Sequence, residues 1–392
     1  MVHHRIPPGV TLANWDLGGE PSAWAFLHAG ELLPSVEIPA ARPPAALEHA
    51  ELRQVSQFEV QAGMSLDQYI ARGSVSGIVV VLSGQIVFER YPRMRSDDRH
   101  LLMSVTKAVT SALIGILEQR GLVDLAQPVD AVIGELAGSG WAGVSACDVL
   151  AMASGIDCLE IDVPGAYTDA GHPFYQFEAA LGWRPAPDGP LPSPYEFVAA
   201  LPSHRSPGEA YEYTGVNTFV LSWLIEQVTG EPFAEVLRRE IWSAAGFEAP
   251  AQLCGSSAGA PGSHGGLCMT LRDLARFGML FTPSAQLIAD RPVIENSHLQ
   301  RIYSSVRPEL HRRDGPLPGY VTAAYGRRLP PASRQWNFAT ADGDLFKGGF
   351  GGQGLYISPT RDLVIAFAGA PLADGSSNLL RWFSRRLALS VA

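Results

Sequence analysis

The sequence predicts an α/β protein whose antiparallel sheet is built from both ends of the chain, with a mostly helical region inserted between them. Two stretches of β-branched and apolar residues predict hairpins, one over residues 77–91 around Ser83-Gly84 and the other over residues 354–369. Patterns with helical spacing lie between these hairpins and after them: residues 195–201, 219–228, 271–281 and 377–391. Strands at both ends with helices between them favour one sheet formed from the two termini.

This order of elements predicts two domains. We expect an α/β sheet domain from residues 1–122 and 283–392, a mostly helical domain from residues 123–282, and an active site in the cleft between them. Residues 1 to about 70 are rich in proline, and we expect them to be irregular up to a short amphipathic segment near residues 66–70. The long loop of residues 157–194 combines Pro, Gly and aromatic residues, which is typical of a segment that shapes a binding cleft.

The composition excludes several classes of partner. The 392 residues are 46% hydrophobic and carry a net charge of −10, which disfavours nucleic acid and anionic membranes as partners. The start of the chain lacks a secretory pattern, no apolar stretch reaches transmembrane length, and the four cysteines show no C-x-x-C spacing. We therefore expect a cytoplasmic protein that acts on a small molecule.

The strongest chemical signal is Ser104-Val105-Thr106-Lys107, which is followed by an apolar run that reads as a helix. Ser104 falls in the first turn and Lys107 one turn later, so their side chains share one side of the helix. A serine there faces unpaired backbone N–H groups, and an amine one turn away can take its proton if burial keeps the amine neutral. This S-x-x-K spacing is typical of serine β-lactamases and penicillin-binding proteins. The alternative is that the two residues belong to a solvated helix face.

The use of lysine favours the chemical interpretation. Of the 29 basic residues 27 are arginine, and only Lys107 and Lys347 are lysine. Arginine stays charged at any working pH, whereas a desolvated lysine can lose its proton and act as a base. We therefore expect a chemical role for both lysines.

Two further motifs match this chemistry. Lys347-Gly348-Gly349 resembles the K-T-G triplet of S-x-x-K enzymes, in which glycine lets a substrate approach a strand edge closely. The N–H of Phe350 would then join the N–H of Ser104 as an oxyanion hole. The alternative here is a Gly-rich hairpin turn.

The third motif is the segment of residues 207–215, in which Tyr213 takes the position of a phenol that relays a proton. In this motif an Asn or Ser usually stands two residues after the tyrosine. Gly215 occupies that position here, so one polar contact is missing. In contrast, Gly255 to Gly259 matches G-x-S-x-G without the strand and helix that a nucleophile elbow requires, so Ser257 is not expected to react.

Together these motifs resemble the serine hydrolases of the class C β-lactamase and esterase superfamily, and within it the 6-aminohexanoate-dimer (nylon-oligomer) hydrolases. The similarity runs almost from end to end and includes five segments: WAFLHAGELLPS (24–35), DDRHLLMSVTK (97–107), NTFVLSWLIEQVTG (217–230), GGLCMTLRDLAR (265–276) and GQGLYISP (352–359). The resemblance implies the β-lactamase/transpeptidase-like α/β fold. It also allows a homodimer.

The resemblance further implies acyl transfer without a metal or an organic cofactor. Lys107 and Tyr213 would activate Ser104, which attacks the carbonyl of a carboxylic ester or a linear amide. Whether the lysine or the tyrosine is the base stays open. The residues implied to contact substrate are Lys347, Gly348, Gly349, Gly215, His264, Asp162 and Tyr167. In the hydrolases of this branch a loop tyrosine contacts the substrate amide, and its place falls on Asp162, with Tyr167 as the nearest phenol.

Gly215 and Asp162 stand where the related hydrolases have a polar residue and a tyrosine. These two differences predict that esters are cleaved faster than amides, because an amide nitrogen must be protonated before it leaves. They also leave two alternatives open, a β-lactamase or D-alanyl peptidase, and a non-catalytic penicillin-recognition protein that binds a peptide. Since arginine keeps the charge but not the basicity of lysine, we expect Lys107→Arg to be nearly as damaging as Lys107→Ala. We expect Lys347→Arg to be milder.

Overall fold

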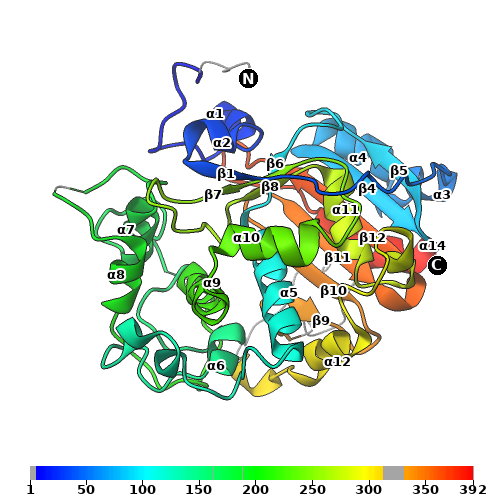
Figure 1. Ribbon diagram of the computed structural model, residues 1–392. Helices are drawn as coiled ribbons and strands as arrows, with labels where there is room; N and C mark the ends of the chain where they lie inside the picture. Colours follow the sequence, from blue (N-terminus) through cyan, green and yellow to red (C-terminus); the bar gives the residue numbers. More distant parts are fainter. Residues whose placement is uncertain (1–5, 162, 188, 312–330, 392) are drawn as a thin grey trace.

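The computed structural model describes residues 6–161, 163–187, 189–311 and 331–391. Its main sheet has six antiparallel strands in the order β5-β4-β12-β11-β10-β9 (Figure 1). Two strands come from the first quarter of the chain and four from its last part: β4 (Val75–Leu82), β5 (Gln85–Arg90), β9 (Phe338–Ala339), β10 (Leu345–Gly349), β11 (Gln353–Ser358) and β12 (Leu363–Gly369). The predicted antiparallel sheet built from both termini is therefore confirmed.

Both predicted hairpins are present, and their turns explain where the strands end. Ser83 and Gly84 have φ values of 49° and 77° and connect β4 to β5. Asp362, with a φ of 48°, precedes β12. Strand β12 then pairs with β4, from Leu363 opposite Leu82 to Gly369 opposite Val75, and this pairing joins the two ends of the chain.

Alternate residues of the central strands face two different cores, as the two-residue period of a strand requires. On one face, Val80 and Ile365 pack in a cluster with side chains of α14 (Leu380–Val391) and α4 (Leu66–Arg72). On the other, Val79 and Val364 join the larger cluster, which includes α11 (Leu271–Met279) and α5 (Thr106–Gln119). Helices therefore cover both faces of the sheet.

A group of helices lies to one side of the sheet, with α5 between them and the strands (Figure 1). These are α6 (Ala146–Leu150), α7 (Pro173–Ala180), α8 (Pro194–Ala199), α9 (Gly215–Thr229) and α10 (Phe233–Leu237). Two further helices are α3 (Arg53–Ser56) and α12 (Asn296–Ser304). The division into domains at residues 122 and 283 stays a prediction; α11, which falls inside the expected helical region, packs on the main sheet.

Residues 6–70 contain more secondary structure than the sequence predicts. They form α1 (Gly19–Ala25), α2 (Ala29–Leu32), β1 (Ser35–Ile38), β2 (Glu59–Gln61) and β3 (Met64–Ser65). Strand β1 belongs to a second sheet in the order β1-β7-β8-β6, with β7 (Ala251–Cys254), β8 (Leu267–Met269) and β6 (His100–Leu101). The expectation of an irregular segment was wrong because pairing with β7, which is distant in sequence, supplies the hydrogen bonds of β1.

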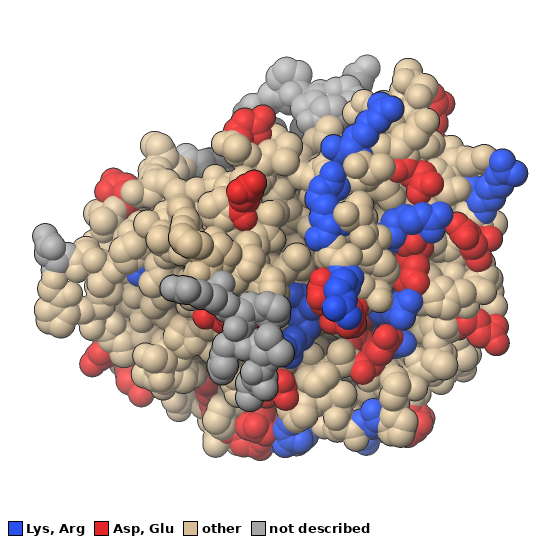
Figure 2. Space-filling model, turned by 90° about the horizontal axis from the view of Figure 1, so that it is seen from above, with Lys and Arg blue, Asp and Glu red and all other residues tan. Residues whose placement is uncertain are grey.

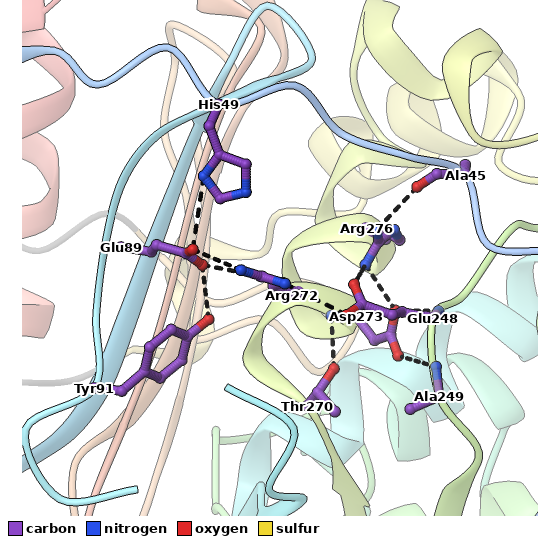
Figure 3. Close-up of polar contacts among 10 residues, drawn as sticks. All are labelled: Ala45, His49, Glu89, Tyr91, Glu248, Ala249, Thr270, Arg272, Asp273 and Arg276. Atoms are coloured by element: carbon purple, nitrogen blue, oxygen red, sulfur yellow. Dashed lines mark hydrogen bonds and ion pairs between the residues drawn. The ribbon is translucent and has the colours of Figure 1, made fainter. Parts of the chain in front are cut away.

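Charged side chains fasten the N-terminal segment and β5 to α11 (Figure 3). Arg272 donates to the Glu89 carboxylate at 2.6 and 2.9 Å. Arg276 contacts Asp273 at 3.1 Å, Glu248 at 2.9 Å and the carbonyl of Ala45 at 2.9 Å. These contacts join three segments that are distant in sequence, and they hold α11 in place beneath the sheet.

The charged side chains are unevenly placed on the face drawn in Figure 2. Basic side chains gather on its right half, next to acidic ones, while the left half carries scattered acidic side chains and very few basic ones. Because both lysines are fully buried, the exposed basic groups on this face are arginines. None of the helices in the described residues has the length and apolar character needed to cross a membrane. Nor do these residues gather three or more His, Cys, Asp or Glu side chains that could hold a metal ion.

Candidate active site

Ser104 lies in a single 3₁₀ turn, η1 (Met103–Val105), that leads directly into α5. Two backbone hydrogen bonds fix the approach to this turn: Leu101 N–H donates to the carbonyl of Phe26 at 2.7 Å and Leu102 N–H donates to that of Leu267 at 2.8 Å. Met103 has a φ of 47°, a left-handed conformation that is unfavourable for a residue with a Cβ atom. Such a conformation directly before a half-buried serine is typical of a functional site.

Lys107 is fully buried on the first turn of α5. Its Nζ lies 3.0 Å from Ser104 Oγ and 2.9 Å from the backbone carbonyl of His264. Glu160 Oε2 lies 3.9 Å from the same nitrogen. Because Lys107 is fully buried, the alternative of a solvated helix face is wrong for this residue.

Burial lowers the pKa of Lys107, whereas the carboxylates of Glu160 and Glu178 raise it. Desolvation disfavours the charged amine, and the two carboxylates partly restore it. The protonation state of Lys107 therefore depends on the balance between its burial and these two carboxylates.

Tyr213 lies between the two lysines, just before α9. Its Oη is 3.3 Å from Lys347 Nζ, and the amines of Lys107 and Lys347 lie 4.9 and 4.8 Å from the centre of its ring. Burial and the Glu160 carboxylate raise the pKa of Tyr213 well above its usual value, although a hydrogen bond with Ser104 lowers it. The phenol is therefore neutral at neutral pH and touches both the serine and the second lysine.

Lys347, Gly348 and Gly349 form the end of β10, as the comparison with K-T-G predicts. Strand β9 pairs with β10 only at Leu345 and Phe346, so the triplet extends beyond its neighbour. A Cβ atom on Gly349 would lie 2.5 Å from the carbonyl oxygen of Leu102. Glycine is needed here because β10 approaches the serine turn this closely, and the same approach brings the residue after the triplet, Phe350, to the site.

The predicted Gly-rich turn is also present, but it follows the triplet. Gly351 and Gly352 have φ values of 87° and 99° and connect β10 to β11. The triplet thus ends a strand and the turn follows it, while the K-T-G-like role of the triplet stays a prediction. The oxyanion role of the Phe350 and Ser104 N–H groups stays a prediction.

The divergent loop brings a phenol and a carboxylate to the site. Tyr167 Oη donates a hydrogen bond to Glu160 Oε1 at 2.8 Å, and its ring stacks on Phe350 with centroids 5.7 Å apart. Asp162, the other residue proposed for this position, lies outside the described residues. Glu160, which is 6% exposed, was missed by the sequence analysis; a single acidic residue between Leu159 and Ile161 was the available signal.

His264 and Gly215 belong to the packing behind the site. The His264 ring stacks on Trp183 with centroids 5.0 Å apart and contributes to the centre through its backbone carbonyl. A Cβ atom on Gly215 would lie 2.8 Å from His264 Cδ2 and 3.1 Å from Phe174 Cε2. The polar side chain expected at position 215 has been replaced by this aromatic contact.

A fully buried ion network anchors the loop and was also missed. Arg184 contacts Asp16 through both of its terminal nitrogens and donates its Nε–H to Glu178 at 2.7 Å. Its guanidinium carbon lies 5.6 Å from the centre of the Tyr167 ring, and Glu178 Oε1 lies 3.8 Å from His264 Nε2. The network therefore connects the N-terminal segment to the residues that surround the serine.

The alternative nucleophile is not part of this arrangement. Ser257 lies in an exposed turn between β7 and β8, and the turn is closed by an isolated bridge between Gly255 and Pro261. The strand-to-helix context of a nucleophile elbow is absent there, as the sequence indicates.

The chain is similar in sequence and in fold to several known proteins. The sequence model of the β-lactamase family matches residues 65–369. The 6-aminohexanoate-dimer hydrolase of Paenarthrobacter ureafaciens is 29% identical over 358 residues, which cover 91% of this chain and 86% of that protein. The structure of the "Putative 6-aminohexanoate-dimer hydrolase from Bacillus anthracis" has a TM-score of 0.79 at 21% identity, covering 98% of this chain and 97% of its own. EstCE1, a hydrolase with promiscuous acyltransferase activity, has a TM-score of 0.58 at 14% identity, covering 83% and 96%. The two structural matches establish the fold.

Replacing Arg184 tests whether the buried network supports the site. Arg184→Met leaves Asp16 and Glu178 buried without their partner, so we expect the free energy of unfolding to fall by about 3–5 kcal/mol. Urea denaturation followed by circular dichroism measures this loss. Arg95→Met is the control, because Arg95 pairs with Asp97 on the surface and both side chains are mostly exposed. Equal stability of the two variants would contradict the role of the network.

Proposed function

Because the chain belongs to the β-lactamase family, we propose that it hydrolyses carboxylic esters and short linear amides through a covalent acyl-enzyme on Ser104. The observation that carries this proposal is the 3.0 Å contact between Ser104 Oγ and the Nζ of the fully buried Lys107. A buried amine at a serine hydroxyl costs desolvation energy, and activation of the hydroxyl gives a chemical reason for it.

The acylation step uses groups that already touch one another. Ser104 Oγ attacks the carbonyl carbon while its proton leaves through the Tyr213 phenol, and the carbonyl oxygen becomes an oxyanion. The N–H groups of Ser104 and Phe350 stabilise that oxyanion from the end of α5 and the end of β10. The leaving alcohol or amine takes a proton from Tyr213, and water then releases the acyl group by the reverse sequence.

Tyr167 is the residue that we assign to amide substrates. Its phenol donates to Glu160, which leaves oxygen lone pairs free to accept the N–H of a substrate amide. An accepted hydrogen bond orients the nitrogen for protonation, whereas an ester has no N–H to offer. This contact takes the role that the sequence analysis assigned to position 162. It also supports slow cleavage of amides of the type named for the Paenarthrobacter relative.

The two alternatives weighed from the sequence have less support. In a non-catalytic binding protein, the desolvation cost of a lysine buried against a serine hydroxyl would have no functional reason. A β-lactam or a D-alanyl peptide presents the same kind of carbonyl, so both belong in the substrate panel beside p-nitrophenyl esters and linear amides.

Ser104→Ala should lower kcat on every substrate of that panel by several orders of magnitude, because it removes the covalent nucleophile. Initial rates of p-nitrophenyl ester hydrolysis provide the measurement. Ser257→Ala is the matched control and should keep normal activity. The proposed site is wrong if the Ser257 variant loses activity and the Ser104 variant keeps it.

Tyr167→Phe should separate the two substrate classes. We expect kcat/KM for a linear amide to fall about tenfold or more, because one hydrogen bond to a charged or reacting group is worth about 1.5 kcal/mol, while ester turnover changes much less. Tyr175→Phe is the control, since its phenol donates to the carbonyl of Pro185 at 3.3 Å on the outer side of the loop. An equal loss on esters and amides would show that Tyr167 only supports the loop.

In the unmodified protein, esters should have a higher kcat/KM than linear amides with the same acyl group, because an alkoxide leaves without the protonation that an amine needs. Matched pairs of substrates measure this ratio. Equal or higher efficiency on the amide would contradict the preference.

A further inference from the structure

We propose that Lys347 is the neutral amine that receives the proton of Ser104 through Tyr213, and that Lys107 works as an ammonium ion held in that form by Glu160. This inference rests on the proposed function, because it assigns the proton path of the Ser104 reaction. It reverses the roles that the sequence suggests for the two lysines.

The partners of Lys107 are those of an ammonium ion. Its nitrogen has three oxygen acceptors around it: Ser104 Oγ at 3.0 Å, the carbonyl of His264 at 2.9 Å and the carboxylate of Glu160 at 3.9 Å. An ammonium offers three donors and no acceptor. The Ser104 hydroxyl and the His264 carbonyl each accept a hydrogen bond from it, and the Glu160 carboxylate lies at ion-pair distance. The carboxylate adds the countercharge that a buried cation needs.

The surroundings of Lys347 are different. Its nitrogen is also fully buried, and within the described residues it has Tyr213 Oη as its hydrogen-bond partner and no carboxylate within 4.0 Å. A neutral amine has a lone pair that accepts the phenol proton, which suits a single hydroxyl neighbour. Each of the two amines lies within 5 Å of the centre of the Tyr213 ring, at 4.9 and 4.8 Å. Two buried cations this close to one ring would repel each other.

The charged groups around the two amines favour the same assignment. Burial and the neighbouring Lys107 lower the pKa of Lys347 well below its usual value, and Glu160 only partly opposes this. For Lys107, burial is opposed by both Glu160 and Glu178. The His264 ring, which also faces Lys107, is itself buried with a lowered pKa, so it adds no competing positive charge.

Glu160 is the positioning residue of this arrangement. Tyr167 Oη donates to its Oε1, while Oε2 faces Lys107. Among the described residues, Glu160 is the carboxylate that lies within 4.0 Å of a lysine amine, and the amine that it contacts is that of Lys107.

The resulting proton path is balanced. As the bond between Ser104 Oγ and the carbonyl carbon forms, the Oγ proton moves to Tyr213 Oη, the phenol proton moves to Lys347 Nζ, and the carbonyl π electrons move to the oxyanion. When the tetrahedral intermediate collapses, the leaving group takes a proton from Tyr213 and Lys347 returns one to the phenol. Lys107 keeps its three protons throughout and stabilises the developing charge at Oγ.

The protein offers a direct test because Lys107 and Lys347 are its only lysines. Labelling with lysine carrying ¹³C at Cε and ¹⁵N at Nζ gives two side-chain signals, whose chemical shifts report the charge of each amine. Either Lys107→Arg or Lys347→Arg assigns them, so one folded variant is sufficient. At neutral pH we expect Lys107 to be charged and Lys347 neutral. Any other assignment, including two charged or two neutral amines, overturns the proposal.

The pH dependence connects this charge state to the reaction. Since Lys347 must be neutral, kcat/KM should fall as the pH decreases through the pKa of Lys347, and the NMR titration of its signal should have the same midpoint. A Lys347 midpoint that differs from the acid limb of the rate profile contradicts its role as the proton acceptor. Labelling of Ser104 by an ester substrate is unaffected by this outcome, so a failure here is distinguishable from failure of the proposed function.

Substitutions give a second test that compares variants at the same position. Lys107→Arg keeps the charge and should retain at least about tenfold more kcat than Lys107→Met, whereas Lys347→Arg should be no better than Lys347→Met. The opposite pattern would restore the assignment suggested by the sequence, with Lys107 as the base.

Discussion

The burial of Lys107 against Ser104 is the constraint on which the site depends. The serine turn and the lysine belong to one continuous segment, η1 and α5, so their contact is fixed locally. The remaining parts come from elements distant in sequence: β10 carries Lys347 and the loop before α7 carries Glu160. A buried ammonium group without a nearby carboxylate or carbonyl would lose its proton or destabilise the fold. The carboxylates and carbonyls around the two lysines therefore determine which amine stays charged.

A second set of paired, buried charges lies farther from the serine. Arg184 holds Asp16 and Glu178 where none of the three side chains is exposed, and it lies beneath the ring of Tyr167. Because removal of one partner leaves an uncompensated buried charge, loss of any member of this network is expected to destabilise the fold. Through Glu178 and Arg184 the network also contacts His264 and the Tyr167 ring beside the site.

The sequence predicted the sheet, both hairpins and the positions of Ser104 and Lys107, because these depend on local periodicity and spacing. It missed the N-terminal strand β1, whose partner β7 is more than two hundred residues away. It also missed Glu160 and Arg184, since the sequence does not show which partner a charged residue of a loop meets in the fold. The loss of a polar contact at Gly215 stays a prediction, whereas the lack of room for a side chain there, beside the His264 ring, is visible only in the structure.

The measurement that tests the account most directly is identification of the acylated residue. The protein is mixed with a p-nitrophenyl ester and quenched in acid during turnover, and its intact mass and peptides are then measured by mass spectrometry. We expect one acyl group per chain, on the peptide that contains Ser104, and none in Ser104→Ala. An acyl group on Ser257, or ester turnover with no covalent adduct on any serine even after rapid quenching, would contradict the proposed reaction.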